Sequence, residues 1–445
     1  MQGESPAQAR EASGTWQRIL SSPSLAVASA LTLRLLLLWL SHHGEDPSHP
    51  RLFTVGLEAH LVAQNLANGK GFFGPYPGYD LPTACLAPVY PFLWAIGNKL
   101  FHLQFGASTL FAQLMNCAFS AATCWPIFGI GRKIFSARVG LASAWLWAFF
   151  PYAILYSLEW TWDQCLSALL LAVIVWVTFL LRESASSLAL TGYGLLWAFA
   201  TLTNPALCVL LPFFLGWLLL RHGAGRSLSF ASATKVLAIF ILAIMPWTIR
   251  NYYQVGGFVF VKSNFGMELW LGNNPTVQHV DSQQFNAMSD KNQVVLLILS
   301  GEPNYNRAKQ REAVAYIKAH PGIFVEHLAK GFADTWAAIY DSYREPWIKI
   351  FHLSRANIWF CLSFSLLSFA GMILALRSSW QPVLPLALAV LILPASYYVT
   401  HTSLRYRHPI DPFLVIFTVY LFARLFGGAR ATRPSDESAA LSAVH

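Results

Sequence analysis

The amino-acid sequence predicts an all-α, polytopic membrane protein with about ten transmembrane helices, amphipathic helices on the outer face and a small extracytoplasmic cap. Of the 445 residues, 55% are hydrophobic and only 11% are charged. Nearly uncharged segments of about 17 to 25 residues recur, and each is long enough to cross a hydrocarbon core roughly 30 Å thick. The net charge of +9 resides in short basic clusters between these segments, which indicates membrane orientation and argues against nucleic acid as a partner.

Long apolar segments define the predicted membrane spans. These segments are 24–41, 107–130, 138–157, 162–181, 187–203, 205–221, 232–250, 356–376, 380–399 and 410–426. One further apolar segment, 86–103, is short and contains Pro88, Pro91 and Lys99. We therefore predict that it does not cross the membrane and stays on the outer side, as a re-entrant or a surface-lying segment.

The distribution of lysine and arginine sets the predicted orientation. With ten spans, most basic residues of the short loops gather on one side, and the opposite short loops carry only Arg405 and Arg407. Because positive charge favours the cytoplasmic side, both termini are predicted to be cytoplasmic, in a cell (inner) membrane. The predicted regions are a cytoplasmic N-terminal segment (1–23), a membrane domain (24–250) with the first outer loop (42–106), an extracytoplasmic cap region (251–355), C-terminal membrane helices (356–426) and a disordered cytoplasmic tail (427–445).

The region 251–355 is the longest stretch outside the predicted spans. Residues 257–263 alternate in the manner of a β-strand, and residues 272–275 predict a turn. Residues 304–320 predict an amphipathic helix that Pro321 interrupts, and a more apolar helix follows. We interpret the whole region as a cap over a pocket on the outer face, because it is too closely tied to the spans to form an independent domain.

Residues 54–72, just after the first span, predict a short amphipathic helix that lies on the membrane surface. Glu58, His60 and Asn65 fall on its polar side, and Gly69 predicts its end. Glu58 has two readings. It is either a first-turn carboxylate that complements the helix macrodipole, or a general base whose pKa is raised by partial burial at the membrane boundary.

Glu159 and Asp163 are the second acidic candidate. Their spacing places both on one face of a helix at the outer end of the span 162–181. Two carboxylates at this spacing repel each other unless they are solvated, bridged by a cation or share a proton. The pair therefore predicts either a solvated helix end or a substrate-binding site. It is also a candidate for a divalent cation, although two carboxylates alone are weak evidence for a metal.

Basic residues at the predicted outer ends of spans suggest an anionic ligand. Arg250, Arg405, Arg407 and His401 lie on the side where the orientation rule disfavours positive charge. The planar fork of a guanidinium suits a phosphate, whereas snorkelling to lipid headgroups is the alternative for Arg250. Arg34, inside the first span, is interpreted as structural or snorkelling.

The sequence lacks the motifs of several other classes of chemistry. The six cysteines fall mostly in apolar segments and form no CxxC pair, so the sequence predicts neither a disulfide framework nor a zinc site. The chain also lacks GxxxxGK[ST], HExxH and a GxGxxG that opens a helix after a strand. An enzyme that works outside the cell without nucleotides needs an activated substrate that is delivered through the membrane.

Seven short motifs occur in a characteristic order. They are 58–72, 87–92, 202–206, 246–251, 269–275, 317–321 and the run Arg405-Tyr-Arg-His-Pro-Ile-Asp411. In this order they resemble the bacterial GT-C membrane glycosyltransferases related to protein O-mannosyltransferases and to the aminoarabinose transferase of lipid A. The resemblance covers about residues 25 to 425 and implies a GT-C-like bundle of transmembrane helices.

The resemblance also implies an activity and its partners. A sugar would move from a polyprenyl-phosphate carrier to a hydroxyl of a lipid, glycan or protein acceptor on the outer face. Glu58 maps onto the catalytic base of the family, and Arg250 and Arg405 map onto residues that contact the carrier phosphate. Asp163 matches an acidic position before the fourth span. With the candidates named above, the predicted donor-phosphate site is Arg250, Arg405, Arg407 and His401, and the predicted substrate-binding residues are Asp163, Glu159, Asn65 and Asn204.

The chain departs from the family pattern in two places. Family members commonly carry a further acidic residue just before the position of Glu58, where this chain has Gly56 and Leu57. An arginine that frequently precedes the proline after the fifth span is replaced by Asn204. These differences predict that the donor phosphate is held differently or that the substrate is unusual.

The favoured mechanism is a single inverting displacement in which Glu58 takes the acceptor proton and arginines stabilise the leaving phosphate. The main alternative is a transporter or lipid flippase, which predicts ionisable residues deep within several spans or an inverted repeat. Apart from Arg34, the predicted spans are nearly free of charge. A non-catalytic assembly or sensor protein is the third interpretation.

Overall fold

The computed structural model describes residues 22–43, 56–103, 105–220, 228–275, 290–339, 342 and 353–426. The predicted cytoplasmic segment up to residue 21, residues 44–55 of the first outer loop and the predicted tail 427–445 lie outside the described residues. The described part of the chain is almost entirely helical, and an isolated β-bridge joins Phe73 and Pro82. This confirms the predicted all-α class.

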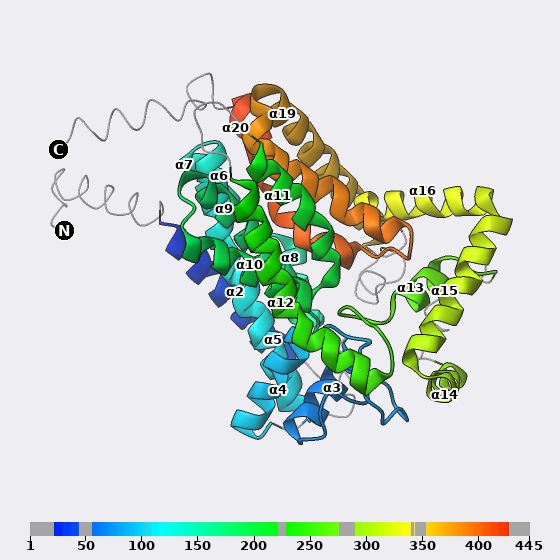
Figure 1. The fold of residues 1–445 in the computed structure, drawn as a ribbon. Helices are drawn as coiled ribbons and strands as arrows, with labels where there is room; N and C mark the ends of the chain where they lie inside the picture. The colour runs from blue at the N-terminus through cyan, green and yellow to red at the C-terminus, as the bar shows by residue number, and fades with distance from the viewer. Residues whose placement is uncertain are drawn as a thin grey trace, which may run out of the picture.

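Most helices form one bundle, with α3 and α4 at one end (Figure 1). The helices of the bundle are α2 (Pro23–His43), α5 (Phe105–Ala122), α6 (Cys124–Ile134), α7 (Ala137–Ala148), α8 (Pro151–Glu159), α9 (Gln164–Glu183), α10 (Ser187–Thr203), η1 (Pro205–Leu210), α11 (Leu211–Leu219), α12 (Phe230–Val255), α19 (Ser354–Tyr398), η3 (Leu404–Ile410) and α20 (Asp411–Phe426). Among the described residues, six helices are long and apolar enough to cross a membrane, and the bent pair α7–α8 makes a seventh span. The chain is therefore a multi-pass membrane protein.

The remaining predicted spans also correspond to helices. The shorter apolar helices α10 and η1–α11 coincide with the predicted spans 187–203 and 205–221. Helix α19 contains two predicted spans, because Ser379 has non-helical backbone angles and divides it. A straight helix would place Ser365 and Tyr398 roughly 50 Å apart. Instead, Trp336 is hydrogen-bonded to both, which shows that α19 reverses direction.

Arg34 stabilises the bend between α7 and α8, which meet at 44°. Its side chain is fully buried, and its guanidinium donates to the carbonyl of Ala148 at 3.0 Å and that of Trp147 at 3.4 Å. A third hydrogen bond reaches the Ser120 hydroxyl at 3.0 Å. The last carbonyls of α7 have no partner within their own helix. Arg34 supplies that partner, so its role in the fold is structural.

The segment 86–103 forms the short helix α4 (Val89–Phe101), which packs against α3 (Leu57–Ala67). At 13 residues α4 is too short to span a bilayer. Helix α3 ends where predicted, because Gly69 has a positive φ of 79°. The prediction for His60 was wrong. It is only 3% exposed and packs edge-on against Trp94, since α4 covers the face of α3 that the sequence assigned to solvent.

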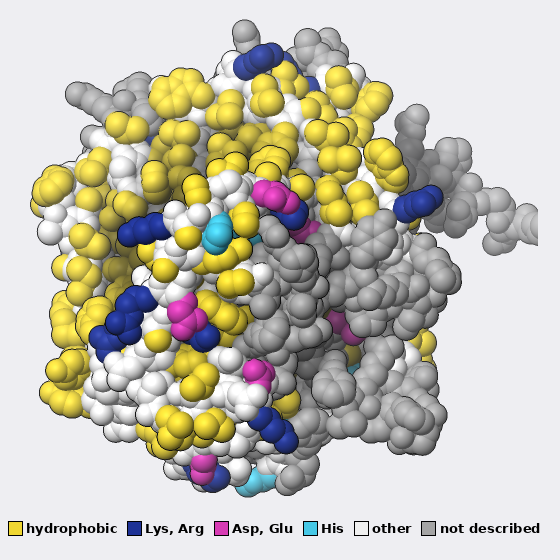
Figure 2. Space-filling model, turned by 90° about the vertical axis from the view of Figure 1, so that its right-hand side faces the viewer, with side chains coloured by type: hydrophobic (Ala, Val, Ile, Leu, Met, Phe, Trp, Pro, Cys, Tyr) yellow, Lys and Arg dark blue, Asp and Glu magenta, His cyan; other side chains and the backbone are white. Residues whose placement is uncertain are grey.

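In the described residues of the cap region lie four helices, which we call the cap helices: α13 (Phe265–Gly272), α14 (Lys291–Ser300), α15 (Glu302–Ala319) and α16 (Pro321–Ala337). They lie beside the bundle, next to the α19 end that carries Tyr398 (Figure 1). A small hydrophobic cluster that includes Met267, Leu297 and Tyr305 joins α13, α14 and α15. On the face shown in Figure 2, hydrophobic side chains gather over the upper part, and most charged side chains that are drawn lie below them.

The prediction of a strand at 257–263 was wrong, because this segment has no neighbouring strand to pair with. Side chains of α12 satisfy its backbone carbonyls instead. Trp247 donates to the carbonyl of Val261 at 2.9 Å, Thr248 to that of Phe260 at 2.8 Å, and Asn251 to both Val259 and Val261. The segment is thus an extended loop held against α12, and it carries the chain from α12 to α13.

Candidate functional site

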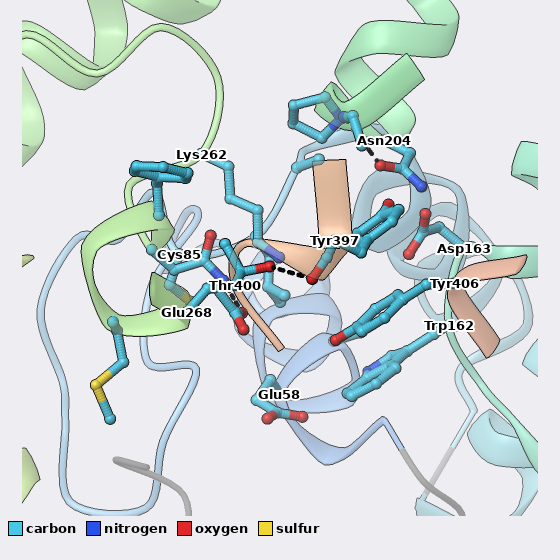
Figure 3. A pocket seen from close by; sticks show the side chains of 18 of the residues that line it. Glu58, Cys85, Trp162, Asp163, Asn204, Lys262, Glu268, Tyr397, Thr400 and Tyr406 are labelled. Carbon is cyan, nitrogen blue, oxygen red and sulfur yellow. Dashed lines mark hydrogen bonds between the residues drawn. The ribbon is translucent and has the colours of Figure 1, made fainter. Parts of the chain in front are cut away.

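A cavity of about 500 Å³ lies between the end of the bundle and the cap helices. Segments far apart in the sequence line it. They are α3, the first outer loop with the start of α4, the α8–α9 loop, the α10–η1 junction, the loop before α13, the cap helices α13, α14 and α15, and residues 396–406. Figure 3 shows acidic, basic and aromatic side chains that point into the same space. The cavity therefore combines charged groups with apolar walls, as expected of a ligand site.

Glu58 lines the cavity from the first turn of α3. The start of the helix is fixed by Gly56, whose φ of 129° is strained for any residue with a side chain. A Cβ atom on Gly56 would also lie 2.6 Å from the carbonyl oxygen of Thr161. This close approach brings Glu58 next to the α8–α9 loop, and it explains why position 56 carries a glycine.

Asp163 lines the cavity, whereas Glu159 is not among the lining residues. The prediction that both share one helix face was wrong, because the chain is not helical between them. Glu159 is the last residue of α8, and Asp163 immediately precedes α9. Asp163 Oδ2 accepts a hydrogen bond from Ser167 at 2.9 Å. The loop between the two acids is held by Asn116, which donates to the carbonyl of Trp160 at 2.6 Å.

Lys262 is a basic residue of the cavity lining and is labelled in Figure 3. It belongs to the loop between α12 and α13, and its ammonium interacts electrostatically with Glu58, Asp163 and Glu268. Within the described part of the chain, its side chain forms no hydrogen bond or ion pair. A cation that faces three carboxylates without a fixed partner is available for an anionic ligand.

Arg405 forms the second basic part of the cavity wall and is 7% exposed. Its guanidinium lies 4.2 Å from the ring centre of Trp162 and 4.8 Å from that of Tyr406. His401 also lines the cavity, with Nδ1 2.9 Å from a carboxylate oxygen of Glu268. Two of the predicted phosphate-binding residues, Arg405 and His401, are therefore in the site.

Arg407 lies outside the cavity and is buried in the bundle with 1% exposure. Its Nε donates to Asp411 at 2.9 Å, and its Nη1 donates to the carbonyl of Thr335 at 3.1 Å. The other carboxylate oxygen of Asp411 lies 3.3 Å from His408 Nδ1. In the 3₁₀ helix η3 (three residues per turn), Arg405 and Arg407 lie about 120° apart around the axis, so Arg405 faces the cavity and Arg407 faces the core. The structure thus gives Arg407 a packing role in place of the predicted contact with phosphate.

Arg250 and Asn65 are also absent from the cavity lining. Arg250 donates hydrogen bonds to the backbone carbonyls of Thr83 and Phe72 and lies over the ring of Trp247. Asn65 donates to the carbonyl of Phe73 at 3.0 Å. Both side chains therefore hold the first outer loop against neighbouring helices. The structure commits their polar groups to backbone atoms, in contrast to the predicted contacts with substrate.

Asn204 does line the cavity, as predicted for a substrate-binding residue. Its side-chain oxygen accepts a hydrogen bond from the backbone N–H of Ala206 at 3.1 Å, which caps the start of η1. Its position where the chain leaves α10 is set by Pro205, which cannot continue the hydrogen bonding of the helix. Asn204 therefore contributes a small polar group where a bulky cation is common in related enzymes.

Glu302 closes the cavity from the cap side. Its carboxylate accepts hydrogen bonds from the Thr83 hydroxyl at 2.7 Å, from the backbone N–H of Ala84 at 2.8 Å and from the Ser263 hydroxyl. These partners come from the first outer loop and from the loop after α12. Because its oxygens already have three donors, Glu302 holds the two loops together and is not a candidate for proton transfer.

The cavity carboxylates differ in their electrostatics. Burial raises the pKa of Glu58, although its backbone hydrogen bond, Arg405 and Lys262 oppose the rise. Burial also raises the pKa of Asp163. For Glu268, the effect of burial is outweighed by the combined effects of His401, Lys262 and Arg405, which lower its pKa to about 2. Glu268 is therefore a permanent anion, while Glu58 and Asp163 are better proton acceptors than ordinary carboxylates.

The described residues contain no group of three or more His, Cys, Asp or Glu side chains that could hold a metal ion. The predicted candidate for a divalent cation, Glu159 with Asp163, is split by the break between α8 and α9. The structure gives no support to a metal at that pair.

Lys262, Glu268, Tyr406 and Trp162 are among the cavity residues that escaped the sequence analysis. Lys262 sits in a segment that was interpreted as a strand, and Glu268 directly precedes one of the seven motifs. Tyr406 lies between the two arginines that drew attention as candidates. A position beside or within a family motif was the available signal for Glu268 and Tyr406, whereas Lys262 and Trp162 lie outside the seven motifs.

A family model described as dolichyl-phosphate-mannose-protein mannosyltransferase matches residues 85–249. This match confirms the predicted resemblance over that part of the chain. No curated protein sequence matches. The aligned region contains the α8–α9 loop with Asp163 and the α10–η1 junction with Asn204.

Solved structures of an oligosaccharyltransferase from Archaeoglobus fulgidus share the fold. One, tethered to an acceptor peptide with an NVT sequon, matches with a TM-score of 0.56 and 16% identity over 92% of this chain and 49% of that chain. Another, the archaeal oligosaccharyltransferase AglB in complex with an inhibitory peptide and a dolichol-phosphate, matches with a TM-score of 0.53 and 15% identity over 92% and 50%. These matches confirm the predicted GT-C-like fold. The chain spans about half the length of these structures.

ArnT from Cupriavidus metallidurans bound to undecaprenyl phosphate also matches, with a TM-score of 0.32 and 14% identity over 84% of this chain and 74% of that chain. No conclusion about fold or function rests on this weaker superposition.

Proposed function

We propose that the protein is a membrane glycosyltransferase that moves a sugar from a polyprenyl-phosphate carrier to a hydroxyl of a lipid, glycan or protein acceptor. The observation that carries this proposal is the meeting of Lys262 and Arg405 with Glu58 and Asp163 in one cavity at the end of a transmembrane bundle. Cations suit a carrier phosphate, and carboxylates of raised pKa suit an acceptor hydroxyl. The shared fold with an oligosaccharyltransferase that holds a dolichol-phosphate supports the same class of donor.

Orientation follows from the same proposal. The cavity lies at the end of the bundle that carries α3 and the cap helices, and the positive-inside rule assigns this end to the extracytoplasmic face of the cell (inner) membrane. Both termini are then cytoplasmic. A donor that is anchored in the outer leaflet can place its phosphate in the cavity without leaving the membrane.

The proposed reaction is a single inverting displacement. Glu58 accepts the proton of the acceptor hydroxyl while the acceptor oxygen bonds to the anomeric carbon, and the bond from that carbon to the phosphate oxygen breaks. Lys262 and Arg405 stabilise the negative charge that develops on the leaving phosphate. The aromatic wall formed by Trp162 and Tyr406 limits the access of water, which would otherwise hydrolyse the donor.

A lipid profile tests the function. Cells that lack the protein should accumulate a polyprenyl-phosphate sugar that cells with the protein consume, and mass spectrometry of extracted lipids would identify that sugar. Re-expression of the intact protein should remove it, whereas the Glu58→Gln variant should not. An unchanged profile of lipid-linked sugars, combined with lipid movement by the purified protein in vesicles, would favour a flippase instead.

Lys262→Met should weaken the binding of undecaprenyl phosphate by about tenfold to a hundredfold. The substitution keeps most of the length of the side chain but removes a charge that faces the cavity, and charge-assisted hydrogen bonds contribute roughly 1.5 to 3 kcal/mol. Binding of the lipid to the purified protein in detergent would be measured by tryptophan fluorescence. Lys330→Met, which removes an exposed lysine on α16, is the matched control and should bind like the wild type. Equal affinities of the Lys262→Met variant and the wild type would refute the assignment.

A further inference from the structure

A chain of four polar side chains runs through the cavity wall from the cap helices to Arg405. Glu268 Oε2, on α13, lies 2.9 Å from His401 Nδ1. The other ring nitrogen of His401, Nε2, lies 3.1 Å from the hydroxyl oxygen of Tyr406. That oxygen in turn accepts a hydrogen bond from Arg405 Nη2 at 2.9 Å. Residues from the cap and from the end of α19 are thus linked to the guanidinium.

The hydrogen-bond donors and acceptors in this series of four side chains can be assigned consistently, starting from Arg405. Arg405 can only donate, so the Tyr406 oxygen accepts, and the hydroxyl proton is free to point at His401 Nε2. A neutral His401 that accepts at Nε2 carries its proton on Nδ1, which faces the Glu268 carboxylate. The far oxygen of Glu268 accepts a hydrogen bond from Asn264. Each group therefore fixes the orientation of the next.

The Glu268 end of the chain is held by close backbone packing. A Cβ atom on Gly272 would lie only 1.6 Å from the carbonyl oxygen of Thr400, so only glycine allows α13 to approach this closely. The next residue, Asn273, donates to the carbonyl of Val399 at 2.9 Å. These contacts place Glu268 beside the segment that carries His401, and they make α13 the fixed end of the chain.

The Arg405 end is held by aromatic rings. The guanidinium carbon lies 4.2 Å from the ring centre of Trp162 and 5.1 Å from that of Trp160. Tyr406 is stacked on Tyr397 with ring centres 4.4 Å apart and planes 2° apart. Stacking fixes the plane of a guanidinium but leaves it free to rotate within that plane. The hydrogen bond from Arg405 Nη2 to the Tyr406 hydroxyl acts against that rotation.

We propose that Glu268, His401 and Tyr406 are positioning residues that set the in-plane orientation of Arg405. This inference rests on the proposed function, because the orientation matters for a planar fork that binds the oxygens of a lipid phosphate. The three residues act through Arg405 and do not themselves contact the phosphate. The packing of α13 against residues 399–401 is thereby coupled to the binding of the lipid-phosphate sugar donor.

Binding of undecaprenyl phosphate to the purified full-length protein tests the proposal. Tyr406→Phe removes the hydroxyl that joins His401 to Arg405 and should weaken binding about fivefold to tenfold. Arg405→Met should weaken it more. In the double variant Arg405→Met/Tyr406→Phe the binding should equal that of Arg405→Met alone, because Tyr406 acts only through the guanidinium.

The Glu268 end offers a test by conservative rescue. Glu268→Met removes both oxygens and should weaken binding as Tyr406→Phe does. Glu268→Gln keeps one oxygen that can accept from His401, and it should recover most of the affinity. Tyr398→Phe is the matched control. This tyrosine is close in sequence to Tyr406, but its hydroxyl accepts from Trp336 at 2.9 Å outside the cavity lining, so its loss should leave binding unchanged.

The outcomes separate the inference from the function on which it rests. Wild-type protein that does not bind undecaprenyl phosphate would overturn the proposed function and this inference together. Wild-type binding with additive losses for Arg405 and Tyr406 would overturn the inference alone. The same holds if Glu268→Met binds like the wild type. Melting temperatures of all variants within a few degrees of the wild type would show that the losses of affinity are not losses of folding.

Discussion

Glu58→Gln should reduce the rate of sugar transfer by about 10² to 10⁴, the usual contribution of a general base. The substitution keeps the shape and the hydrogen-bonding length of the side chain at the first turn of α3 but removes the proton acceptor. Transfer from a defined polyprenyl-phosphate sugar would be measured in membranes that contain equal amounts of each variant. Binding of the donor should change little, because Glu58 acts on the acceptor.

The pH profile gives this prediction a second readout. Because burial raises the pKa of Glu58, the wild-type rate should fall as the pH drops through a value above the ordinary glutamate range of about 4.3. Glu58 is then protonated and cannot accept the acceptor proton. Glu326→Gln, at an exposed carboxylate on α16, should retain the full rate and the same profile. Full transferase activity in Glu58→Gln would make Asp163 the better candidate for the base.

Arg407→Met should destabilise the fold by about 3 to 5 kcal/mol, because it leaves the Asp411 carboxylate buried without its cation. Both side chains are almost completely buried, and their atoms are 2.9 Å apart. Thermal unfolding in detergent, followed by circular dichroism, would measure the effect as a clearly lower melting temperature. Activity should fall in proportion to the loss of folded protein.

The double variant Arg407→Met/Asp411→Asn serves as the control, because it removes both charges. It should melt at a higher temperature than Arg407→Met, since no unpaired charge remains in the core. If Arg407→Met instead melted like the wild type and lost affinity for undecaprenyl phosphate, the original prediction of a phosphate contact would be right. The two readouts therefore distinguish a packing role from a binding role.

The architecture of the bundle could be predicted from the sequence because it depends on local properties. Each predicted span is a run of apolar residues, and membrane helices satisfy their own backbone hydrogen bonds. Helix α3 ends just before Gly69 and α10 ends at Asn204, because these residue types favour helix ends. That tendency is also a local property. For the same reason, the isolated alternation at 257–263 was misleading. A strand needs a partner that the sequence of the segment does not reveal.

The site could be predicted only in part, because tertiary contacts decide which of the candidate side chains face the cavity. Arg405 and Arg407 look equivalent in the sequence, yet η3 turns one to the cavity and the other to Asp411. Arg250 is a reasonable phosphate-binding candidate in the sequence, but its guanidinium donates hydrogen bonds to two backbone carbonyls. Lys262 carried no local signal, since two of the three carboxylates that it faces, Glu58 and Asp163, are distant in the sequence.

The hydrogen bonds of Glu302 have a consequence for the biogenesis of the protein. Its carboxylate ties residues near 83 to Ser263, and the opposite wall of the cavity comes from residues 396–406. A chain that is still being inserted into the membrane lacks these later segments, even when the residues of α3 and of the α8–α9 loop have already been synthesised. The cavity is therefore incomplete until synthesis is nearly finished, and under the proposed function the nascent protein could not bind its donor.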